Sequence, residues 1–236
     1  MKTLALGLAL AVLATGAFAQ EKGAMPASGP DNTLSAAEKA QGWTLLFDGK
    51  TTAGWKGFKT LAPDAGWKVV GGALTPDPKI SKDLVTKASY ENFELAFDWK
   101  ISPKGNSGVM FHVIPVGDET YESGPEYQIL DNAHGEKPPE QAAALYALYP
   151  PSMDMTKPVG QFNHSRLIVD HGKVQHWLNG MMVTEYDLNS ADFKARVAAS
   201  KFKQWPQFAT GKSGAIALQC HGNDVAYKNL KIKVLK

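Results

Sequence analysis

The feature that most constrains the fold of this chain is its succession of short segments in which apolar residues alternate with polar ones. In residues 93–101 the apolar side chains fall at every second position, which is typical of a β-strand with one face in a hydrophobic core. Similar segments recur along the chain, separated by turn signals such as Gly71-Gly72 and Asn179-Gly180. About a dozen short strands with little helix predict an all-β fold, an antiparallel sandwich of two sheets.

The expected strands run from residue 43 almost to the end of the chain. They are residues 43–47, 67–70, 73–75, 84–86, 93–101, 107–113, 126–130, 165–169, 173–178, 181–186, 215–221 and 225–235. Two short helices are expected, at 34–41, where Ser35 and Glu38 have capping-box spacing, and at 191–204, which Pro206 follows. Residues 133–160 are rich in Pro and Ala, show no regular period and predict a long loop.

The N-terminal residues have the pattern of a cleavable secretion signal. Lys2 precedes an apolar run that is too short to span a bilayer, and small residues flank Phe18 at the expected cleavage site. Cleavage after Ala19 predicts a secreted or periplasmic protein. We therefore expect a signal peptide at 1–19, a flexible leader with a short helix at 20–41, and one β-sandwich domain at 42–236, with no membrane span.

Charge and cysteine content limit the class of partner. Removal of Lys2 leaves 24 of the 25 Lys and Arg residues against 23 Asp and Glu residues, and no basic stripe is present. This balance argues against nucleic acid or an anionic membrane and favours a small neutral or polar ligand. Cys220 is the only cysteine, so an intrachain disulfide is excluded and the core must hold the fold.

The segment 124–132 combines an apolar face with a polar one. Because side chains alternate along a strand, Glu126 and Gln128 share one face, while Tyr127 and Ile129 point into the core. Asp131 would reach the polar face only through a bulge or at the strand's end. The segment suits the floor of a binding cleft, and an ordinary solvent-exposed sheet face is the alternative.

Residues 215–221 form the second informative strand. Ile216, Leu218 and Cys220 share one face, which we expect in the core, so the thiol is expected to be inert. The opposite face carries two alanines followed by Gln219 and His221. The small alanine side chains leave space above the sheet, and Gln219 and His221 place two hydrogen-bonding groups at one end of this face. In the alternative interpretation, His221 merely ends the strand and caps a turn.

A third strand adds further polar candidates. Asn106, Met110 and His112 are expected on one face, and Gly105 and Gly108 would allow close backbone approach. A glycine-rich turn is the alternative. Phosphate-binding loops, His-Glu-x-x-His, cysteine pairs and Gly-x-Ser-x-Gly are absent from the sequence. No cofactor is required by the sequence, although a divalent cation could be held by the oxygen atoms of Asp131, Asn132 and Asp154.

Several motifs, taken together and in order, resemble a bacterial family. They are Trp43-Thr-Leu-Leu-Phe-Asp-Gly49, Gly54-Trp55, Asn106-Ser-Gly-Val-Met-Phe111, Glu126-Tyr-Gln-Ile-Leu-Asp-Asn132, Leu178-Asn-Gly180, Gly214-Ala-Ile-Ala-Leu-Gln-Cys-His-Gly222 and Lys228-Asn-Leu-Lys-Ile232. With these motifs, residues from about 42 to 236 resemble the 3-keto-disaccharide hydrolase family, formerly a family of unknown function. The resemblance implies a concanavalin-like jelly roll, similar to that of laminarinase-type glycosidases.

This sequence departs both from the pattern of laminarinase-type glycosidases and from that of the 3-keto-disaccharide hydrolase family. Laminarinase-type enzymes carry Glu-x-Asp-x-x-Glu on the corresponding strand, whereas this chain has Gln128 and Asp131, so the usual pair of carboxylates is altered. Within the family's own pattern, His112 stands where Arg is common and Phe162 replaces a Trp before Asn163. Cys220 replaces a residue that is commonly acidic or small.

The activity implied by the resemblance is cleavage of glycosides already oxidised at C3. A 3-keto group acidifies the C2 proton, so one base, one acid and donors for the enolate oxygen are sufficient. Glu126 and His221 are the candidate base and acid, in either order, with Asn106, Gln128 and Gln219 as contacts to the oxyanion or to hydroxyl groups. The remaining substrate-binding candidates are His112, Asp131, Tyr146 and Asn163.

Aromatic residues complete the set of expectations. Tyr146 and Tyr149, in the 133–160 loop, are candidates for stacking on a sugar ring, and core positions are expected for Trp43, Trp55, Trp67 and Trp99. Two other functions compete with a glycoside-cleaving enzyme: a carbohydrate-binding module without catalysis, and a structural domain of the cell envelope. The sugar, its linkage and the oligomeric state are left open.

Overall fold

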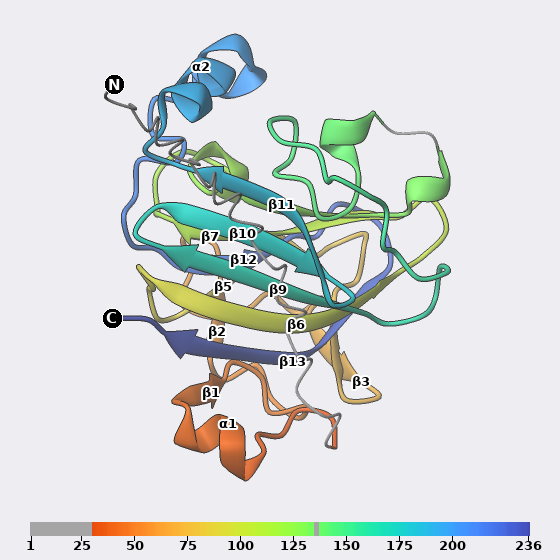
Figure 1. The fold of residues 1–236 in the computed structure, drawn as a ribbon. Coiled ribbons are helices and arrows are strands. Elements are labelled where there is room, and N and C mark those ends of the chain that lie inside the picture. Colours follow the sequence, from red (N-terminus) through yellow and green to blue (C-terminus); the bar gives the residue numbers. More distant parts are fainter. Residues whose placement is uncertain (1–29, 135–136) are drawn as a thin grey trace, which may run out of the picture.

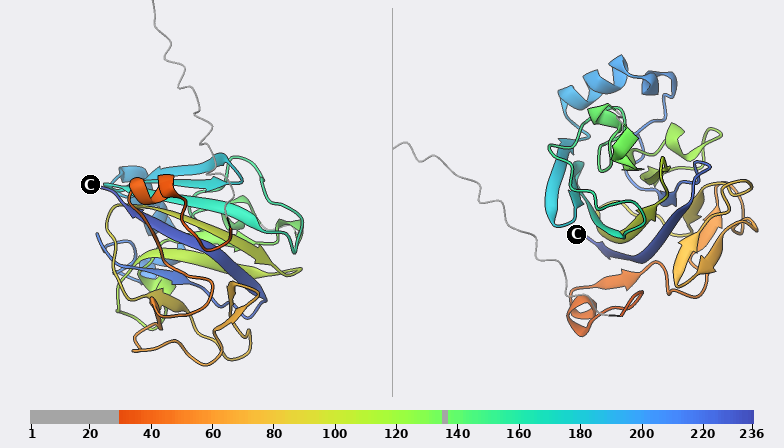
Figure 2. Two further views of the ribbon diagram at one scale, coloured as in Figure 1. Left: turned by 90° about the horizontal axis from the view of Figure 1, so that it is seen from below. Right: turned by 90° about the vertical axis from the view of Figure 1, so that its right-hand side faces the viewer.

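The computed structural model describes residues 30–134 and 137–236. The predicted signal peptide, the cleavage site after Ala19 and residues 20–29 of the predicted leader lie outside the described residues. Within these limits, two antiparallel sheets stack face to face as a jelly-roll sandwich, which confirms the predicted all-β class (Figure 1). Figure 2 shows the same layers from two further directions.

The larger sheet has eight strands in the described part of the chain. In order they are β11 (Met181–Asp187), β10 (Lys173–Leu178), β9 (Asn163–Asp170), β6 (Phe93–Ile101), β13 (Val225–Val234), β4 (Ala73–Thr75) and β3 (Lys68–Val70), with β1 (Trp43–Leu45) also paired to β13. The alternating apolar side chains of β6 are all buried against the other sheet. All four tryptophans predicted in the core are buried as well.

The smaller sheet has five strands in the same described range. They are β2 (Trp55–Gly57), β5 (Leu84–Thr86), β12 (Ala215–Leu218), β7 (Asn106–Val113) and β8 (Glu126–Leu130). Strand β2 was not predicted, because its three residues are too few to show a period. One face of this sheet packs into the main core. The opposite face carries a small apolar cluster that includes Val85, Met110 and Ala217, and beside it stand the polar side chains of the site.

Both predicted helices are present, although the first begins at Ala36 instead of at residue 34. Helix α1 (Ala36–Ala40) starts after Ser35, whose Oγ accepts from the Glu38 backbone N–H at 3.2 Å while the Glu38 carboxylate accepts from the Ser35 N–H at 2.8 Å. The predicted helix over 191–204 is divided into α2 (Ala191–Ala199) and the 3-10 helix η4 (Lys201–Gln204). Ser200 makes the break because its Oγ accepts from the Phe202 N–H at 3.1 Å.

The predicted loop over 133–160 has a structural role that its sequence did not reveal. Besides η2 (Asn132–His134) and η3 (Pro138–Glu140), it contains a segment that extends the smaller sheet beyond β8. Ala143 N–H donates to the Gln128 carbonyl at 2.8 Å, and Tyr146 N–H donates to the Glu126 carbonyl at 3.1 Å. This loop, α2 and the 3-10 helix η1 (Thr120–Glu122) gather along one side of the molecule (Figures 1 and 2).

Candidate functional site

A pocket of about 260 Å³ lies on the face of the smaller sheet that points away from the core. Its floor comes from β7, β8 and β12, and its walls come from η1, η4 and the 133–160 loop. It is lined by Asn106, Tyr121, Glu126, Gln128, Tyr146, Lys201, Phe202, Trp205, Gln219 and His221. Six of these ten residues belong to the predicted site, so the structure brings the greater part of that site together.

Glu126 is the central ionisable group of the pocket. Strand β8 presents it next to β7, where Gly108 leaves space for its carboxyl: a Cβ at position 108 would lie 2.1 Å from Glu126 Oε1. The carboxyl makes no hydrogen bond within the described residues. Burial raises the pKa of Glu126 to about 8, the charge of Asp83 adds to the rise, and the Lys201 ammonium opposes it. Glu126 is therefore mostly protonated near neutral pH.

Three amide side chains that line the pocket have buried oxygen atoms without a hydrogen-bond partner among the described residues. They are Asn106 Oδ1, Gln128 Oε1 and Gln219 Oε1. Gln128 is almost fully buried, and its Nε2 donates to the Glu140 carbonyl at 3.2 Å, which fixes the orientation of the amide. Buried polar atoms normally have partners, so oxygens without one indicate a place for a ligand's hydroxyl groups.

His221 and Gln219 reach the pocket through the alternation predicted for the strand. Ile216 and Leu218 point into the main core, whereas Ala215 and Ala217 face the pocket side. Ordered pairing ends at Leu218, but hydrogen bonds keep the following residues in place. Gln219 N–H donates to the Gly108 carbonyl at 2.9 Å, and Ser107 Oγ–H donates to the Gln219 carbonyl at 2.7 Å. The His221 side chain stands at the exposed mouth of the pocket.

Asp83 lies beneath the site and holds two of its walls. No sequence motif indicates that Asp83 belongs to a site. Its Oδ1 accepts from the Cys220 N–H at 2.9 Å, directly before His221, and its Oδ2 accepts from Thr120 Oγ of η1. Burial raises the pKa of Asp83. Burial also raises the pKa of the Cys220 thiol, whose side chain packs against the core as predicted for an inert cysteine.

The aromatic and cationic wall was only partly predicted. Tyr146 lines the pocket, but Tyr149 does not: its ring stacks on Tyr186 with centroids 5.2 Å apart. Sequence reasoning missed Tyr121, Lys201, Phe202 and Trp205. These residues come from η1 and from the segment after α2, and only the fold brings them to the sheet. The break at Ser200 is the local signal that turns Lys201 and Phe202 out of the helix.

His112 is not in this pocket, and the prediction that it shares a face with Asn106 and Met110 is wrong. The pairing of β7 with β12 shifts register at this point, and His112 has a φ of +53°, so a β-bulge re-aims the side chain. The ring packs edge-on against Phe93, and its Nε2 lies 2.8 Å from the Glu91 carbonyl oxygen. Burial lowers the pKa of His112.

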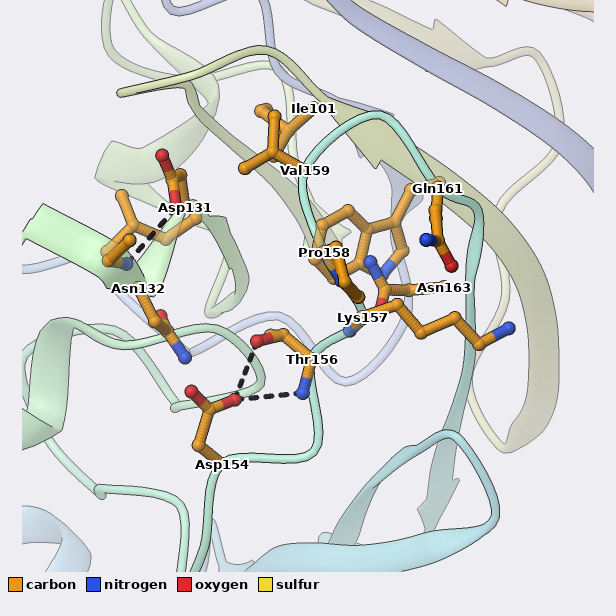
Figure 3. A pocket seen from close by; sticks show the side chains of 13 residues that line it. Ile101, Asp131, Asn132, Asp154, Thr156, Lys157, Pro158, Val159, Gln161 and Asn163 are labelled. Carbon is orange, nitrogen blue, oxygen red and sulfur yellow. Dashed lines mark hydrogen bonds between the residues drawn. The ribbon is translucent and has the colours of Figure 1, made fainter.

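Asp131 and Asn163 line a different pocket of about 320 Å³ (Figure 3). No bulge brings Asp131 round to Glu126: its carboxylate accepts from the Lys104 N–H at 2.8 Å and from the Ala133 N–H at 3.1 Å. Asn163 Oδ1 accepts from Lys157 N–H and from Asn179 Nδ2–H, both at 2.8 Å. These bonds hold surface loops, so the structure separates both residues from the other site candidates.

The three candidate cation ligands also belong to this second pocket. Asp154 Oδ1 accepts from the N–H of Thr156 at 2.8 Å and from its hydroxyl at 2.7 Å, as Figure 3 shows. In the described part of the chain, no group of three or more His, Cys, Asp or Glu side chains is arranged to hold a metal ion. A cation at Asp131, Asn132 and Asp154 stays a prediction.

Comparison with known proteins places this geometry in a family. Residues 42–233 match the 3-keto-alpha-glucoside-1,2-lyase-like domain. The chain belongs to this family. A 3-keto-disaccharide hydrolase from Bacteroides thetaiotaomicron is 32% identical over 230 residues, which cover 83% of this chain and 79% of the relative. Membership of the 3-keto-alpha-glucoside-1,2-lyase-like family confirms both the resemblance and the expected class, an enzyme that acts on glycosidic bonds.

Solved structures agree with the family assignment. A candidate glycosyl hydrolase from Parabacteroides distasonis is 36% identical, with a TM-score of 0.83 over 87% of this chain and 100% of that chain. A second one from the same organism is 25% identical, with a TM-score of 0.59 over 82% of this chain and 99% of the other. No helix among the described residues is long and apolar enough to cross a membrane.

Proposed function

We propose that this protein cleaves glycosides whose sugar ring carries a ketone at C3, and that the reaction takes place in the pocket around Glu126. The family and the named relative support this substrate class. The observation that carries the proposal is the environment of Glu126. A buried carboxyl with a pKa of about 8 stands in a pocket whose buried amide oxygens lack partners, beside an accessible histidine.

The raised pKa supports Glu126 as the proton donor. A carboxyl with a pKa of about 8 holds its proton at pH 7 and can give it to a departing glycosidic oxygen. Glu126 is therefore the acid in this proposal. His221, which lines the same pocket and is exposed at its mouth, is then the base. An accessible imidazole can return its proton to water between turnovers.

The proposed reaction begins at C2. His221 takes the C2 proton, and the electron pair of the broken C–H bond forms an enolate with the C3 oxygen. The enolate electrons then form the C1–C2 double bond and restore the C3 ketone as the C1–O bond breaks. The leaving group departs with the proton of Glu126. Water then adds across C1 and C2: its oxygen bonds to C1 as Glu126 takes back one proton, and C2 takes a proton from the His221 imidazolium after this has exchanged with solvent. The product is the 3-keto sugar, both residues are restored, and the net reaction is hydrolysis.

The amides of the pocket floor fit the hydroxyl groups of the sugar. Each oxygen of Asn106, Gln128 and Gln219 can accept a hydrogen from one hydroxyl group. The Tyr146 and Trp205 rings stand at the walls, where the apolar face of a sugar can pack. In this arrangement the floor orients the substrate, and Glu126 and His221 perform the proton transfers.

Turnover of a 3-keto-glucoside by single-residue variants tests this proposal. Glu126→Gln keeps the shape of the side chain but removes the acid, and His221→Ala removes the base, so each is expected to lower kcat by about 100-fold or more. His171→Ala serves as the matched control, because His171 is an exposed histidine outside this pocket. Unchanged turnover in Glu126→Gln or His221→Ala contradicts the assignment. Sugar binding by the wild-type protein without any product favours a binding module instead.

A further inference from the structure

The buried amide oxygens on the pocket floor are hydrogen-bond acceptors. One N–H of the Gln128 amide donates to the Glu140 carbonyl, and the amide oxygen lacks a partner among the described residues. The oxygens of Asn106 and Gln219 also lack partners within the described residues. Acceptors suit the hydrogens of sugar hydroxyl groups. They do not suit a ketone oxygen, which has no hydrogen, or an enolate oxygen, which carries negative charge. A ketone oxygen needs a donor, and the enolate oxygen that forms from it is best stabilised by a donor that carries positive charge.

Lys201 meets that need by charge and by position. It is the only Lys or Arg among the residues that line the pocket in the described part of the chain. Its Nζ lies 4.4 Å from the centroid of the Tyr146 ring, and the Tyr146 backbone is hydrogen-bonded to that of Glu126. Ser200 caps η4, so this helix begins at Lys201 and the backbone from which the Lys201 side chain extends is held in place. An ammonium group thus stands on the wall of the pocket that contains Glu126.

We propose that the ammonium group of Lys201 binds the C3 ketone oxygen of the substrate and stabilises the enolate oxygen that forms from it, so that Lys201 selects oxidised over unoxidised sugars. This inference rests on the proposed function of the same pocket. The ammonium keeps its three protons throughout, while the C2 proton goes to the base. A charge aimed at an oxygen that becomes negative lowers the barrier more than it strengthens substrate binding.

Electrostatics within the pocket agree with this placement. The positive charge of Lys201 opposes the rise in the pKa of Glu126, as expected of two groups that line the same pocket. The Lys201 side chain is exposed and makes no ion pair within the described residues, so its charge is available to a ligand. The Tyr146 and Phe202 rings flank the ammonium and limit where it can go.

Binding measurements in an inactive background test the proposal apart from catalysis. Calorimetry in the Glu126→Gln variant would compare a 3-keto-disaccharide with the same disaccharide before oxidation. Adding Lys201→Met is expected to weaken binding of the oxidised sugar about 10-fold or more, because a charge-assisted hydrogen bond is lost, and to leave the unoxidised sugar unaffected. Lys203→Met is the matched control, because Lys203 lies on the same η4 turn but does not line the pocket.

Kinetics provide the second readout. In the otherwise wild-type protein, Lys201→Met should lower kcat more than it raises KM, and Lys201→Arg should restore part of kcat because it returns a cation. Equal loss of affinity for both sugars, or the same effect from Lys203→Met, contradicts the role of Lys201. So does a covalent adduct at Lys201 trapped by borohydride, which would indicate an imine. Failure of the wild-type protein to turn over any 3-keto-glycoside contradicts the proposed function itself, whatever the Lys201 variants show.

Discussion

Replacing Gly108 by Ala tests whether the position of Glu126 controls the reaction. The new Cβ would lie 2.1 Å from Glu126 Oε1 and 2.7 Å from its Cδ. Ordinary contact begins at 3.4 Å, so the carboxyl oxygen has to withdraw by about 1.3 Å. A displacement of about 1 Å at a catalytic group can cost about 100-fold in rate, and we expect a loss of that size in kcat. The fold should tolerate the change, because the three nearest atoms, Oε1, Cδ and Cγ at 2.8 Å, all belong to the Glu126 side chain and none to the backbone.

The assay combines turnover of a 3-keto-glucoside with thermal unfolding of the same samples. Gly54→Ala is the matched control, because its Cβ would meet only the Leu46 carbonyl oxygen, at 3.4 Å, away from the pocket. We expect Gly108→Ala to unfold near the wild-type temperature with greatly reduced kcat, and Gly54→Ala to match the wild type in activity. Full activity in Gly108→Ala would refute the reasoning, since the carboxyl cannot stay where it is beside the new methyl group.

Three further predictions concern charge and packing. The folded-state pKa of Glu126 is raised from 4.5 to about 8, so the protein binds this proton more tightly when folded, and the resulting stability is lost as the pH rises from about 4.5 towards 8. Glu126→Gln should therefore unfold at a higher temperature than the wild type near pH 8, with the difference shrinking towards pH 4, and equal curves at every pH would contradict the raised pKa. As the proposed acid, Glu126 also predicts a rate that falls above about pH 8. Asp83→Asn removes a charge that raises the pKa of Glu126 and should move the fall in rate to lower pH. Lys201→Met removes a charge that lowers this pKa and should move the fall in rate to higher pH. A shift in the same direction for both variants would contradict these electrostatic contributions. His112→Leu should leave kcat unchanged and lower the free energy of unfolding by about 1–3 kcal/mol, because the Glu91 carbonyl loses its hydrogen-bond partner. A fall in kcat without a loss of stability would show that His112 does take part in the reaction.

Most of the fold could be predicted because it depends on local patterns. Alternation in β6 and β12 predicted which side chains pack into the main core, and Asn179-Gly180 predicted the hairpin between β10 and β11. At Asn179 and Gly180 φ is +48° and +89°, the left-handed conformations that such a two-residue turn requires. Strand β2 was missed because three residues define no period.

The site could be predicted only where its residues sit on regular strands. Glu126, Gln128, Gln219 and His221 were found because alternation fixes their face. His112 was misplaced because a bulge in β7 breaks the alternation, and no glycine marks it. Lys201 and the other wall residues depend on how segments distant in the sequence pack onto the sheet.

The segment 142–147, which pairs with β8 and extends the smaller sheet, was not predicted for a different reason. Ala143 and Ala147 have φ values of +65° and +60°, which are unusual for alanine and are imposed by the tertiary structure. Residues with such conformations give no periodic signal in the sequence. The backbone of this segment nevertheless positions Tyr146 beside Glu126 and thereby completes the wall of the pocket.

Incorporation of deuterium at C2 tests the central claim most directly. If the C2 proton is removed and water then adds across C1 and C2, a 3-keto-disaccharide cleaved in D₂O should yield a 3-keto sugar with one deuterium at C2, seen by NMR at early times. The 3-keto sugar incubated alone corrects for spontaneous exchange. A product that retains its original C2 hydrogen would show direct hydrolysis of the C1–O bond and contradict the proposed route through Glu126 and His221.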